Sequence, residues 1–535
     1  MPAATPWKPK EMLAGMSAVA DTHIKDVEKF IQHYGLRYLR ISSMQNEGET
    51  MSIGQIAERQ YSMFINGESV TRSKMIPVVN PTTEEVISEV PEADEGLVND
   101  AVSAATHAQL SWARLPAIKR AGYLHEIANL VRGRKEHLAK IISEEQGKIL
   151  PLALVEVDFS ADYLDYMAGM ARGYEGEIIQ SDRPGENILL YKAPIGVIAG
   201  ILPWNFPFFL IMRKMAPALV TGNTIVIKPS EETPNNACEF AKIVADSSLP
   251  KGIFNLVTGR GPSVGLSLAA HPGIGMVSLT GSVEAGSAVM RAAASNITKV
   301  SLELGGKAPA IVMDDANLDL AVKAIRDSRI INTGQVCNCA ERVYVHERIA
   351  DEFIKRVTEA MQQTRSGDPF EDDIEMGPLV NKAQLHRVES AVEQAVKSGA
   401  ELALGGERDN RSKGFFYKPT VLKNCQQSTE IMQKEIFGPV LPIATFSHLD
   451  EAIEMANDCE YGLTSSIFTQ RLDAAMRAAN ELKFGETYVN REHFEAMQGF
   501  HAGWRKSGIG GADGKHGLAE FLQTHVIYMN YDVKK

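Results

Sequence analysis

Strand-length apolar runs alternate with amphipathic stretches through the middle of this chain. The runs cover residues 195–202, 224–228, 253–257, 276–280 and 300–304. The stretches with helical spacing cover residues 208–220, 236–247, 262–270 and 284–294. This alternation predicts βαβ units in a parallel, doubly wound sheet of the α/β class. Such sheets bind ligands beyond the carboxyl ends of their strands, so functional residues are expected there.

A second series of strands and helices follows the first. Its expected elements cover residues 310–313, 318–328, 342–345, 350–364, 442–446 and 449–457. Together the two series predict two α/β domains. A helical region precedes them over residues 101–170, and the pair Asn66-Gly67 predicts a hairpin. Residues 524–529 predict a last strand that must pair with another strand, which could belong to another subunit.

Residues 1–57 show no strong periodicity. A secretory signal fits poorly because the apolar run at 12–20 is short, and a mitochondrial presequence fits poorly because the stretch is acidic. We expect an N-terminal extension that is either disordered or not native. In the second case translation starts at Met51, because codons for residues 47–50 can spell a ribosome-binding site.

The charge balance excludes several classes of partner. With 55 basic and 67 acidic residues the net charge is −12, so no basic field exists to attract nucleic acid or anionic membranes. No apolar run is long enough to span a bilayer, and the nearest, 206–220, is interrupted by Arg213 and Lys214. The hydrophobic content of 44% is that of a soluble globular protein with sizeable cores.

The five cysteines are few and odd in number, which indicates a reducing compartment and a cytoplasmic protein. Cys238, Cys425 and Cys459 are isolated and are expected to be plain core residues. No cysteine pair or histidine cluster has the spacing of zinc ligands, so no metal site is expected.

Cys337 and Cys339 lie on a segment with Gly334, between a predicted helix and a predicted strand. An average intracellular cysteine is buried and inert. A glycine-flanked connection between regular elements, however, is a usual place for chemistry on a rigid scaffold. Cys337 is therefore a candidate nucleophile if the rest of the chain supplies partners for it.

Two segments at predicted strand ends are candidates for binding a dinucleotide. Gly281 and Ser282 follow a strand and open a helix, where backbone N–H groups could hold pyrophosphate, although an ordinary N-cap fits equally well. Lys228, Ser230 and Glu231 end the second strand, where they could bind ribose or form a solvated turn. The charge of Glu231 would repel a 2′-phosphate, which favours NAD over NADP.

Five motifs in order resemble those of the aldehyde dehydrogenase superfamily. They are Pro203-Trp204-Asn205-Phe206-Pro207, Lys228-Pro229-Ser230-Glu231, Leu302-Glu303-Leu304-Gly305-Gly306-Lys307-Ala308-Pro309, Gly334-Gln335-Val336-Cys337-Asn338-Cys339-Ala340 and Glu435-Ile436-Phe437-Gly438-Pro439. Cys337 follows Glu303 by 34 positions, as in the family. The likeness covers residues 62–531, and five ordered motifs are specific where each one alone is not.

The resemblance implies NAD-dependent oxidation of an aldehyde. Cys337 would be the nucleophile, selected over Cys339 by its place after Gly334. Glu303 would activate the water that hydrolyses a thioester. The side-chain amide of Asn205 and the backbone N–H of Cys337 would stabilise the oxyanion. A turn residue and a strand-terminal acid are the plain structural readings of Asn205 and Glu303.

The resemblance also implies which residues bind the cofactor and the substrate. The cofactor residues would be Leu202, Trp204, Lys228, Ser230, Glu231, Gly281, Ser282, Leu304, Glu435 and Phe437. Residues 176–187 and 498–505 resemble a branch that oxidises small 2-hydroxyaldehydes. Its substrate contacts would be Arg213, Asn338, Glu495 and His501, although Arg213 could also be a surface charge on an apolar helix.

The fold implied by the resemblance has a Rossmann-like NAD-binding domain, an α/β catalytic domain and a small β oligomerisation element. The NAD-binding domain would cover 58–172 and 194–305, and the catalytic domain 306–518. Strands within 173–193 and 519–535 would pair between subunits of a homodimer or homotetramer.

Other functions stay open at this point. Another aldehyde, such as an aminoaldehyde or succinate semialdehyde, is the main alternative. A CoA-acylating enzyme would not need Glu303 to hydrolyse the thioester. A cysteine esterase would use Cys337 and Glu303 without NAD. A non-catalytic relative would have no need of Cys337, Glu303 and Asn205 together.

Overall fold

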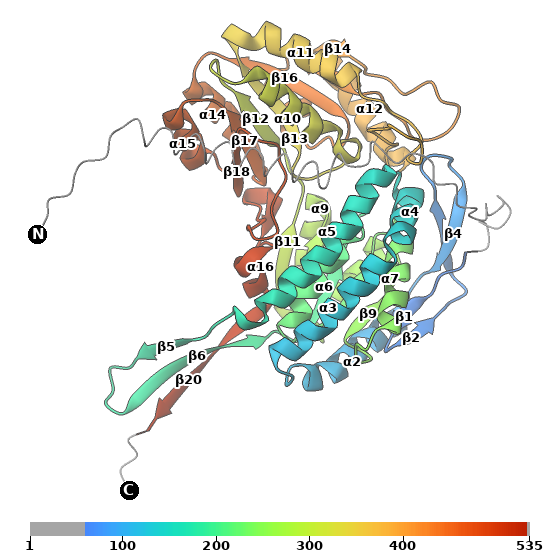
Figure 1. Cartoon of the computed structure of the whole chain (residues 1–535), viewed down its shortest axis with the longest axis vertical. Helices are drawn as coiled ribbons and strands as arrows, with labels where there is room; N and C mark the ends of the chain where they lie inside the picture. Colours follow the sequence, from blue (N-terminus) through green and yellow to red (C-terminus); the bar gives the residue numbers. More distant parts are fainter. Residues whose placement is uncertain (1–58, 532–535) are drawn as a thin grey trace, which may run out of the picture. The chain divides into compact units, whose positions relative to one another are not determined.

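The computed structural model describes residues 59–531 of the chain (Figure 1). The expected N-terminal extension, residues 1–57, and the hypothesis of a start at Met51 lie outside the described residues.

The first sheet has eight strands in the order β19-β11-β10-β7-β8-β9-β1-β2. The five predicted apolar runs form its parallel strands, which are β7 (Val197–Ile201), β8 (Thr224–Lys228), β9 (Phe254–Leu256), β10 (Met276–Thr280) and β11 (Lys299–Glu303). Antiparallel strands flank them, namely β1 (Met63–Ile65), β2 (Glu68–Val70) and β19 (Gly508–Ile509). The predicted hairpin is confirmed, because Asn66 and Gly67 join β1 to β2 with φ angles of 53° and 77°.

The order of the parallel strands creates a switch point beside β7. From β7 the chain adds β8 and β9 on one side, then returns to place β10 and β11 on the other. The loops that follow β7 and β10 therefore diverge at the carboxyl edge of the sheet, which is where ligands of such sheets bind.

Helices cover both faces of this sheet because its strands are apolar on both sides. Ile198 faces one hydrophobic core and its neighbours Val197 and Ala199 face the other, as the two-residue period of a strand requires. One core contains α3 (Ala117–Gly133), α4 (Lys135–Gln146), α5 (Leu150–Gly169), α6 (Phe209–Val220) and α7 (Asn235–Asp246). The other contains α2 (Glu95–Trp112), α8 (Leu266–Ala269) and α9 (Val283–Ala293). The helix expected over 262–270 is shorter, because a π-helical turn with glycine at each end occupies Gly261–Gly265.

The second sheet has seven strands in the order β14-β15-β16-β13-β12-β17-β18. The strands are β12 (Ala308–Val312), β13 (Ala340–His346), β14 (Glu401–Leu404), β15 (Thr420–Lys423), β16 (Val440–Phe446), β17 (Thr464–Phe468) and β18 (Glu486–Val489). Its helices are α10 (Leu318–Ile330), α11 (Ala350–Gln362), α12 (Lys382–Lys397), α13 (Glu430–Gln433), α14 (Leu449–Asn457) and α15 (Leu472–Glu481). All its strands are parallel except β14.

The expectation that the second series ends with α14 is wrong, since β17, α15 and β18 follow. The strand β17 reads Thr-Ser-Ser-Ile-Phe, which lacks an apolar run, yet every residue in it is buried. Two of its three hydroxyls are satisfied internally: Thr464 donates to the Asn338 carbonyl at 2.8 Å and Ser465 to the Glu486 carbonyl at 3.0 Å. A buried strand whose polar groups bond within the fold has no hydrophobic signature in the sequence.

A three-stranded antiparallel sheet joins β5 (Glu177–Gln180) and β6 (Glu186–Pro194) to β20 (Leu522–Asn530) (Figure 1). The predicted last strand is therefore confirmed, and its partner is corrected. It pairs with β6 of the same chain from Leu522 with Pro194 to Asn530 with Glu186, so the pairing needs no second subunit. A short helix, α16 (Gly514–Glu520), leads into β20, and a hairpin of β3 (Met75–Val79) and β4 (Val86–Pro91) completes the strands.

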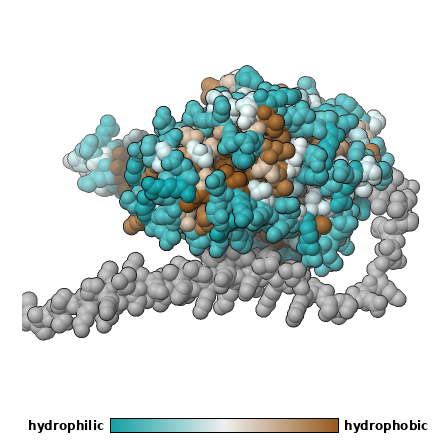
Figure 2. Space-filling model, turned by 90° about the horizontal axis from the view of Figure 1, so that it is seen from above, coloured by the Kyte–Doolittle hydropathy of each residue, from teal (hydrophilic) through white to brown (hydrophobic). Residues whose placement is uncertain are grey.

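The surface in Figure 2 is mostly hydrophilic, with hydrophobic residues interrupting it in several places. Within residues 59–531 no helix combines the length and the apolar character needed to cross a membrane.

Asn223 ties the C-terminal segment to the first sheet. It is fully buried, donates to the Phe521 carbonyl at 2.8 Å and accepts from the Gly196 N–H at 2.8 Å.

We predict that Asn223→Ala lowers the free energy of unfolding by about 2–4 kcal/mol, because the buried Phe521 carbonyl and Gly196 N–H lose their hydrogen bonds. Urea unfolding measures it, with exposed Asn296→Ala as the control, expected to change stability by less than about 0.5 kcal/mol. Equal stability of the two variants would contradict the prediction.

Candidate active site

The segment before Cys337 is a left-handed turn. Asn332, Thr333 and Gly334 have φ angles of 47°, 59° and 71°. A β-branched residue in this region costs about 1–3 kcal/mol and persists only where its surroundings hold it. Thr333 is held by its hydroxyl, which donates to the Gly377 carbonyl at 3.0 Å. The tight glycine-containing turn expected from the sequence is thus present, in a strained form.

The two cysteines of this segment differ in environment. Cys337 is partly exposed, whereas Cys339 is buried, and burial raises the pKa of the Cys339 thiol to about 12. A thiol that stays protonated at neutral pH is a poor nucleophile. Of the other cysteines, Cys238 and Cys425 are buried as expected, while Cys459 is half-buried and its sulfur lies 3.1 Å from Arg342.

Asn205 lies against the Cys337 turn. Its side-chain Nδ2 donates to the Gln335 carbonyl at 3.0 Å. The backbone carbonyl of Asn205 accepts from Asn332 Nδ2 at 3.0 Å. A buried Lys148 holds the same carbonyl at 2.8 Å and pairs with Glu156. The structure therefore brings the predicted amide donor next to the predicted nucleophile.

The carboxylate of Glu156 on α5, which pairs with Lys148, also anchors the start of the next helix. Glu156 accepts from the backbone N–H groups of Phe208 and Phe209, at 2.9 and 3.1 Å, where α6 begins. The Lys148 ammonium also lies 3.7 Å from the centre of the Phe206 ring. One buried ion pair thus fixes the loop that follows β7.

Glu303 ends β11, and its carboxylate accepts from the Thr280 hydroxyl at 2.8 Å. Burial opposes its ionisation, but the positive charges of Lys214, Arg213 and His501 hold the pKa of Glu303 below its usual value. Glu303 is therefore a carboxylate at neutral pH. The ammonium of Lys214 is buried behind it and donates to Ser278 at 3.0 Å.

The four predicted substrate residues come together from three segments of the chain, with Glu495 and His501 both in the loop after β18. Arg213 on α6 binds Glu495 at 3.1 Å, and Glu495 accepts from the side-chain amide of Asn338. Arg213 also forms two hydrogen bonds to the buried Asp513. The result is a continuous chain of polar contacts from Asp513 to the residue beside Cys337.

His501 is the fourth of these residues and is almost fully buried. Burial disfavours its charged form, but the carboxylate of Glu486 and the Cys337 side chain raise the pKa of His501 well above its usual value. Its backbone is fixed by paired hydrogen bonds with Ala512, both of 2.9 Å. His501 is therefore a cation beside the predicted nucleophile.

The predicted cofactor residues line the carboxyl ends of β7, β8, β10 and β11. Leu202 follows β7 and its N–H donates to the Lys228 carbonyl at 3.0 Å. The Lys228 ammonium is buried and bonds Glu231 at 3.1 Å. Burial raises the pKa of Glu231, but Lys228 outweighs it and lowers the pKa overall, so the carboxylate is charged. Ser230 lies between them and is buried.

The next two strands bring the remaining residues of this edge. The N–H of Gly281 donates to the Glu303 carbonyl at 3.0 Å, and Ser282 caps α9 by accepting from the Ala285 N–H at 3.2 Å. Leu304 packs directly on Gly286, where a Cβ would collide with it. The first turn of α9 is thus exposed at the switch point, as binding of pyrophosphate by its N–H groups requires.

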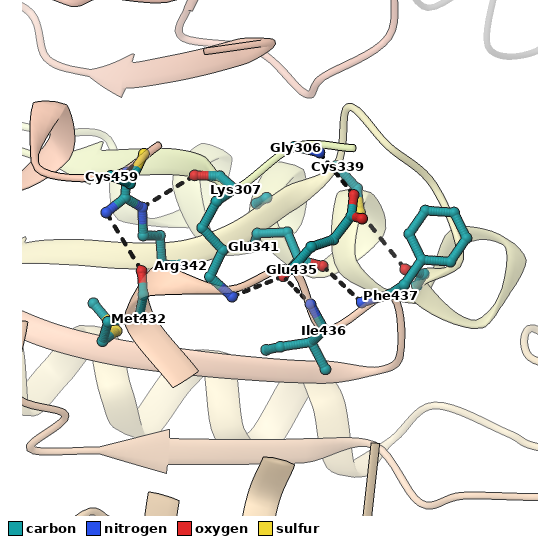
Figure 3. Close-up of polar contacts among 12 residues, drawn as sticks. Gly306, Lys307, Cys339, Glu341, Arg342, Met432, Glu435, Ile436, Phe437 and Cys459 are labelled. Carbon is teal, nitrogen blue, oxygen red and sulfur yellow. Dashed lines mark hydrogen bonds and ion pairs between the residues drawn. The ribbon is translucent and has the colours of Figure 1, made fainter. Parts of the chain in front are cut away.

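Glu435 lies in the loop between α13 and β16 and points toward Gly306 (Figure 3). Its carboxylate accepts from the Gly306 N–H at 2.7 Å, and burial together with the nearby Glu341 raises the pKa of Glu435 to about 8. The ring of Phe437 meets Trp204 edge-on at 5.3 Å between centroids. A half-buried carboxyl with one backbone partner and spare acceptor capacity fits ribose hydroxyls, and the Glu231 charge fits a cofactor without a 2′-phosphate.

Several residues that shape this site were not found from the sequence. Lys148, Lys214, Glu486 and Asp513 are buried or nearly so and bond or face a predicted residue, and the buried Glu156 is the partner of Lys148. Lys214 left a signal, because it interrupts an apolar helix. The others left none, since their partners lie far away in the sequence.

Within the described part of the chain, no three histidine, cysteine or acidic side chains are grouped so that they could hold a metal ion.

We predict that iodoacetamide at neutral pH modifies Cys337 much faster than Cys339. The reason is that Cys339 is buried and its thiol stays protonated, whereas Cys337 is partly exposed beside the His501 cation. Peptide mass spectrometry over time measures both rates in one sample. Comparable rates at the two cysteines would contradict this reading of the turn.

The Aldehyde dehydrogenase family profile matches residues 68–527. Lactaldehyde dehydrogenase of Escherichia coli is 62% identical over 473 residues, which span 88% of this chain and 98% of that protein. Its crystal structure matches with a TM-score of 0.87 over 88% of this chain and 99% of that one.

Two further relatives are more distant. The 3,6-anhydro-alpha-L-galactose dehydrogenase of a Vibrio species is 44% identical over 479 residues, or 89% of this chain and 100% of that protein. Betaine aldehyde dehydrogenase of Staphylococcus aureus, solved in complex with NAD+, is 35% identical, with a TM-score of 0.87 over 89% of this chain and 96% of that one. The profile and these relatives cover nearly all of the described residues, and the chain belongs to the aldehyde dehydrogenase family.

Proposed function

We propose that this protein oxidises small 2-hydroxyaldehydes with NAD, converting lactaldehyde to lactate and glycolaldehyde to glycolate. The observation that carries the proposal is the chain of contacts Arg213–Glu495–Asn338, which ends beside Cys337. The 62% identity to lactaldehyde dehydrogenase of Escherichia coli supports it.

Cys337 attacks the aldehyde carbon and forms a thiohemiacetal. The side-chain amide of Asn205 and the N–H of Cys337 stabilise the oxyanion, and losing one such donor typically costs about a hundredfold or more in rate. NAD, when bound, supplies the hydride acceptor. Glu303, a carboxylate at neutral pH, then takes a proton from water so that the thioester on Cys337 is hydrolysed.

The proposed cofactor residues divide between the two sheets. Lys228, Ser230 and Glu231 would hold the adenosine ribose, and Gly281 and Ser282 the pyrophosphate. Leu202, Trp204 and Leu304 would pack on the cofactor. Glu435 and Phe437 would contact the nicotinamide half.

The charge of the substrate site separates a hydroxyaldehyde from its main rival. A semialdehyde with a carboxylate, such as succinate semialdehyde, needs a free cation to bind it. Arg213 is already paired with Asp513 and Glu495, so it has no free charge to offer. Glu495 instead offers a carboxylate oxygen that can accept from a substrate hydroxyl. An analogue without the hydroxyl would lack this contact, which disfavours it relative to the hydroxyaldehyde.

The wider assignments are proposals of the same kind. Residues 58–172 and 194–305 form the NAD-binding domain, 306–518 the catalytic domain, and 173–193 with 519–535 the oligomerisation strands of a cytoplasmic homodimer or homotetramer. β19, residues 508–509, pairs with β11 of the first sheet. The proposed catalytic domain therefore contributes a strand to the first sheet close to its C-terminal boundary.

We predict that the protein forms NADH from lactaldehyde with a kcat/KM at least about a hundredfold above that for propanal, because propanal has no hydroxyl to donate to Glu495. Cys337→Ala should abolish this activity, whereas the matched variant Cys339→Ala should keep most of it. NADH absorbance measures all three. Equal rates on propanal would remove the hydroxyl-binding role, and undiminished activity of Cys337→Ala would refute the assignment of the nucleophile.

We predict that Lys214→Met moves the acid limb of the kcat profile to higher pH. The buried Lys214 ammonium helps to hold the pKa of Glu303 low, so its loss raises that pKa, and the base loses its charge at a less acidic pH. The control is Lys323→Met, an exposed lysine on α10. An acid limb that coincides with wild type in both variants would show that Lys214 does not act on the base.

A further inference from the structure

Three fully buried charged side chains lie behind the site, namely Lys307, Arg329 and Glu341. The Glu341 carboxylate pairs with Lys307 Nζ and with Arg329 Nη1, both at 2.8 Å. Figure 3 shows Lys307 and Glu341 joined in this way. We call these three residues the buried triad.

Glu341 reaches from the triad to the loop that carries Glu435. Its carboxylate accepts from the backbone N–H groups of Ile436 and Phe437, at 3.0 and 3.2 Å (Figure 3). Phe437 has a φ of 58°, a left-handed conformation that a bulky residue adopts only under constraint. The carboxylate of Glu341 thus holds a strained backbone directly after Glu435.

Arg329 reaches from the triad to the turn that carries Cys337. Its guanidinium donates to the carbonyls of Gly334 and Ala340, the latter at 2.9 Å, and lies 2.9 Å from the sulfur of Cys339. Cys337 lies between these contacts in the sequence. The strained residues Asn332 and Thr333 immediately precede Gly334.

Lys307 belongs to the segment that follows Glu303, and that segment has no free space around it. A Cβ on Gly305 would collide with the Glu435 carboxylate, and a Cβ on Gly306 with the Cys337 carbonyl. A Cβ on Gly334 would collide with the backbone of Gly438, just after Phe437. The turn of Cys337 therefore touches both other segments through backbone atoms, and the segment after Glu303 meets the loop that carries Glu435 through the Glu435 side chain.

We propose that the buried triad is a positioning device. It holds three segments in register with one another: the turn that carries Cys337, the segment that follows Glu303 and the loop that carries Glu435. The roles of those three segments rest on the proposed function. Each triad residue takes its countercharge from the triad. Glu341 sends its remaining contacts to the loop after Glu435 and Arg329 sends its own to the turn of Cys337, while Lys307 belongs to the segment after Glu303. Removing the charge of Glu341 leaves two buried cations without a partner, so both strained loops lose their anchor together.

The test uses Glu341→Gln, with Glu145→Gln as a matched control. Glu145 is also fully buried and also accepts from two backbone N–H groups, those of Asn235 and Asn236, but neither belongs to the three segments. A second variant, Arg329→Lys, keeps the positive charge and loses the fork that grips the turn. Two readouts need no aldehyde: the Kd for NAD by calorimetry, and the rate at which iodoacetamide modifies Cys337 without NAD.

We expect Glu341→Gln to weaken NAD binding and to slow modification of Cys337, each by about tenfold or more, because both loops move from their productive geometry. Arg329→Lys should slow modification of Cys337 to a similar degree while changing the Kd for NAD by less than about threefold. Glu145→Gln should leave both quantities within about twofold of wild type, as expected for a distant site.

A folded Glu341→Gln with both quantities within twofold of wild type would overturn the proposal, as would equal effects in Glu145→Gln. If Glu341→Gln does not fold, Arg329→Lys decides, since an unchanged rate at Cys337 would overturn the link to the turn. A failure of the proposed function is seen separately, as wild-type protein that forms no NADH from lactaldehyde, because the modification rates do not depend on that activity.

Discussion

A charged side chain inside a protein is stable only where a partner charge and hydrogen bonds replace the water it has lost. Among the described residues, three such groups of paired buried charge each lie under a loop with a candidate functional residue. Lys148 and Glu156 fix the loop of Asn205, and Arg213 with Asp513 fixes Glu495. The buried triad of Lys307, Arg329 and Glu341 fixes the turn of Cys337 and the loop of Glu435. Pairing of buried charge thus sets the geometry in which the reactive groups meet.

The parallel core of the fold could be predicted from the sequence because its strands are buried on both faces and therefore read as apolar runs. All five runs between residues 195 and 304 became strands of the first sheet. Prediction failed at β17, where serine and threonine are buried through bonds to Asn338 and Glu486. It also left the partner of the last strand open, because pairing with β6, over 300 positions away, leaves no local signal.

The same contrast holds for the candidate site. The resemblance supplied residues in five ordered motifs, and the structure places Asn205 against the turn of Cys337 and connects Arg213 to Asn338 through Glu495. The residues that hold them could not be inferred. A lone Glu341 or Asp513 looks like any other acid, and only the fold shows that it is buried against a cation. Local strain was equally hidden, since nothing in Thr333 or Phe437 predicts a positive φ.

The central claim is that the partly exposed Cys337, and not the buried Cys339, forms the covalent bond to the aldehyde carbon. Trapping the acyl enzyme tests it most directly. In Glu303→Gln the base that activates water is lost, so mixing this variant with NAD and lactaldehyde should leave a lactoyl group on the peptide of Cys337, seen by mass spectrometry after rapid quenching. A lactoyl group on Cys339, or no covalent adduct while NADH is still formed, would contradict the account.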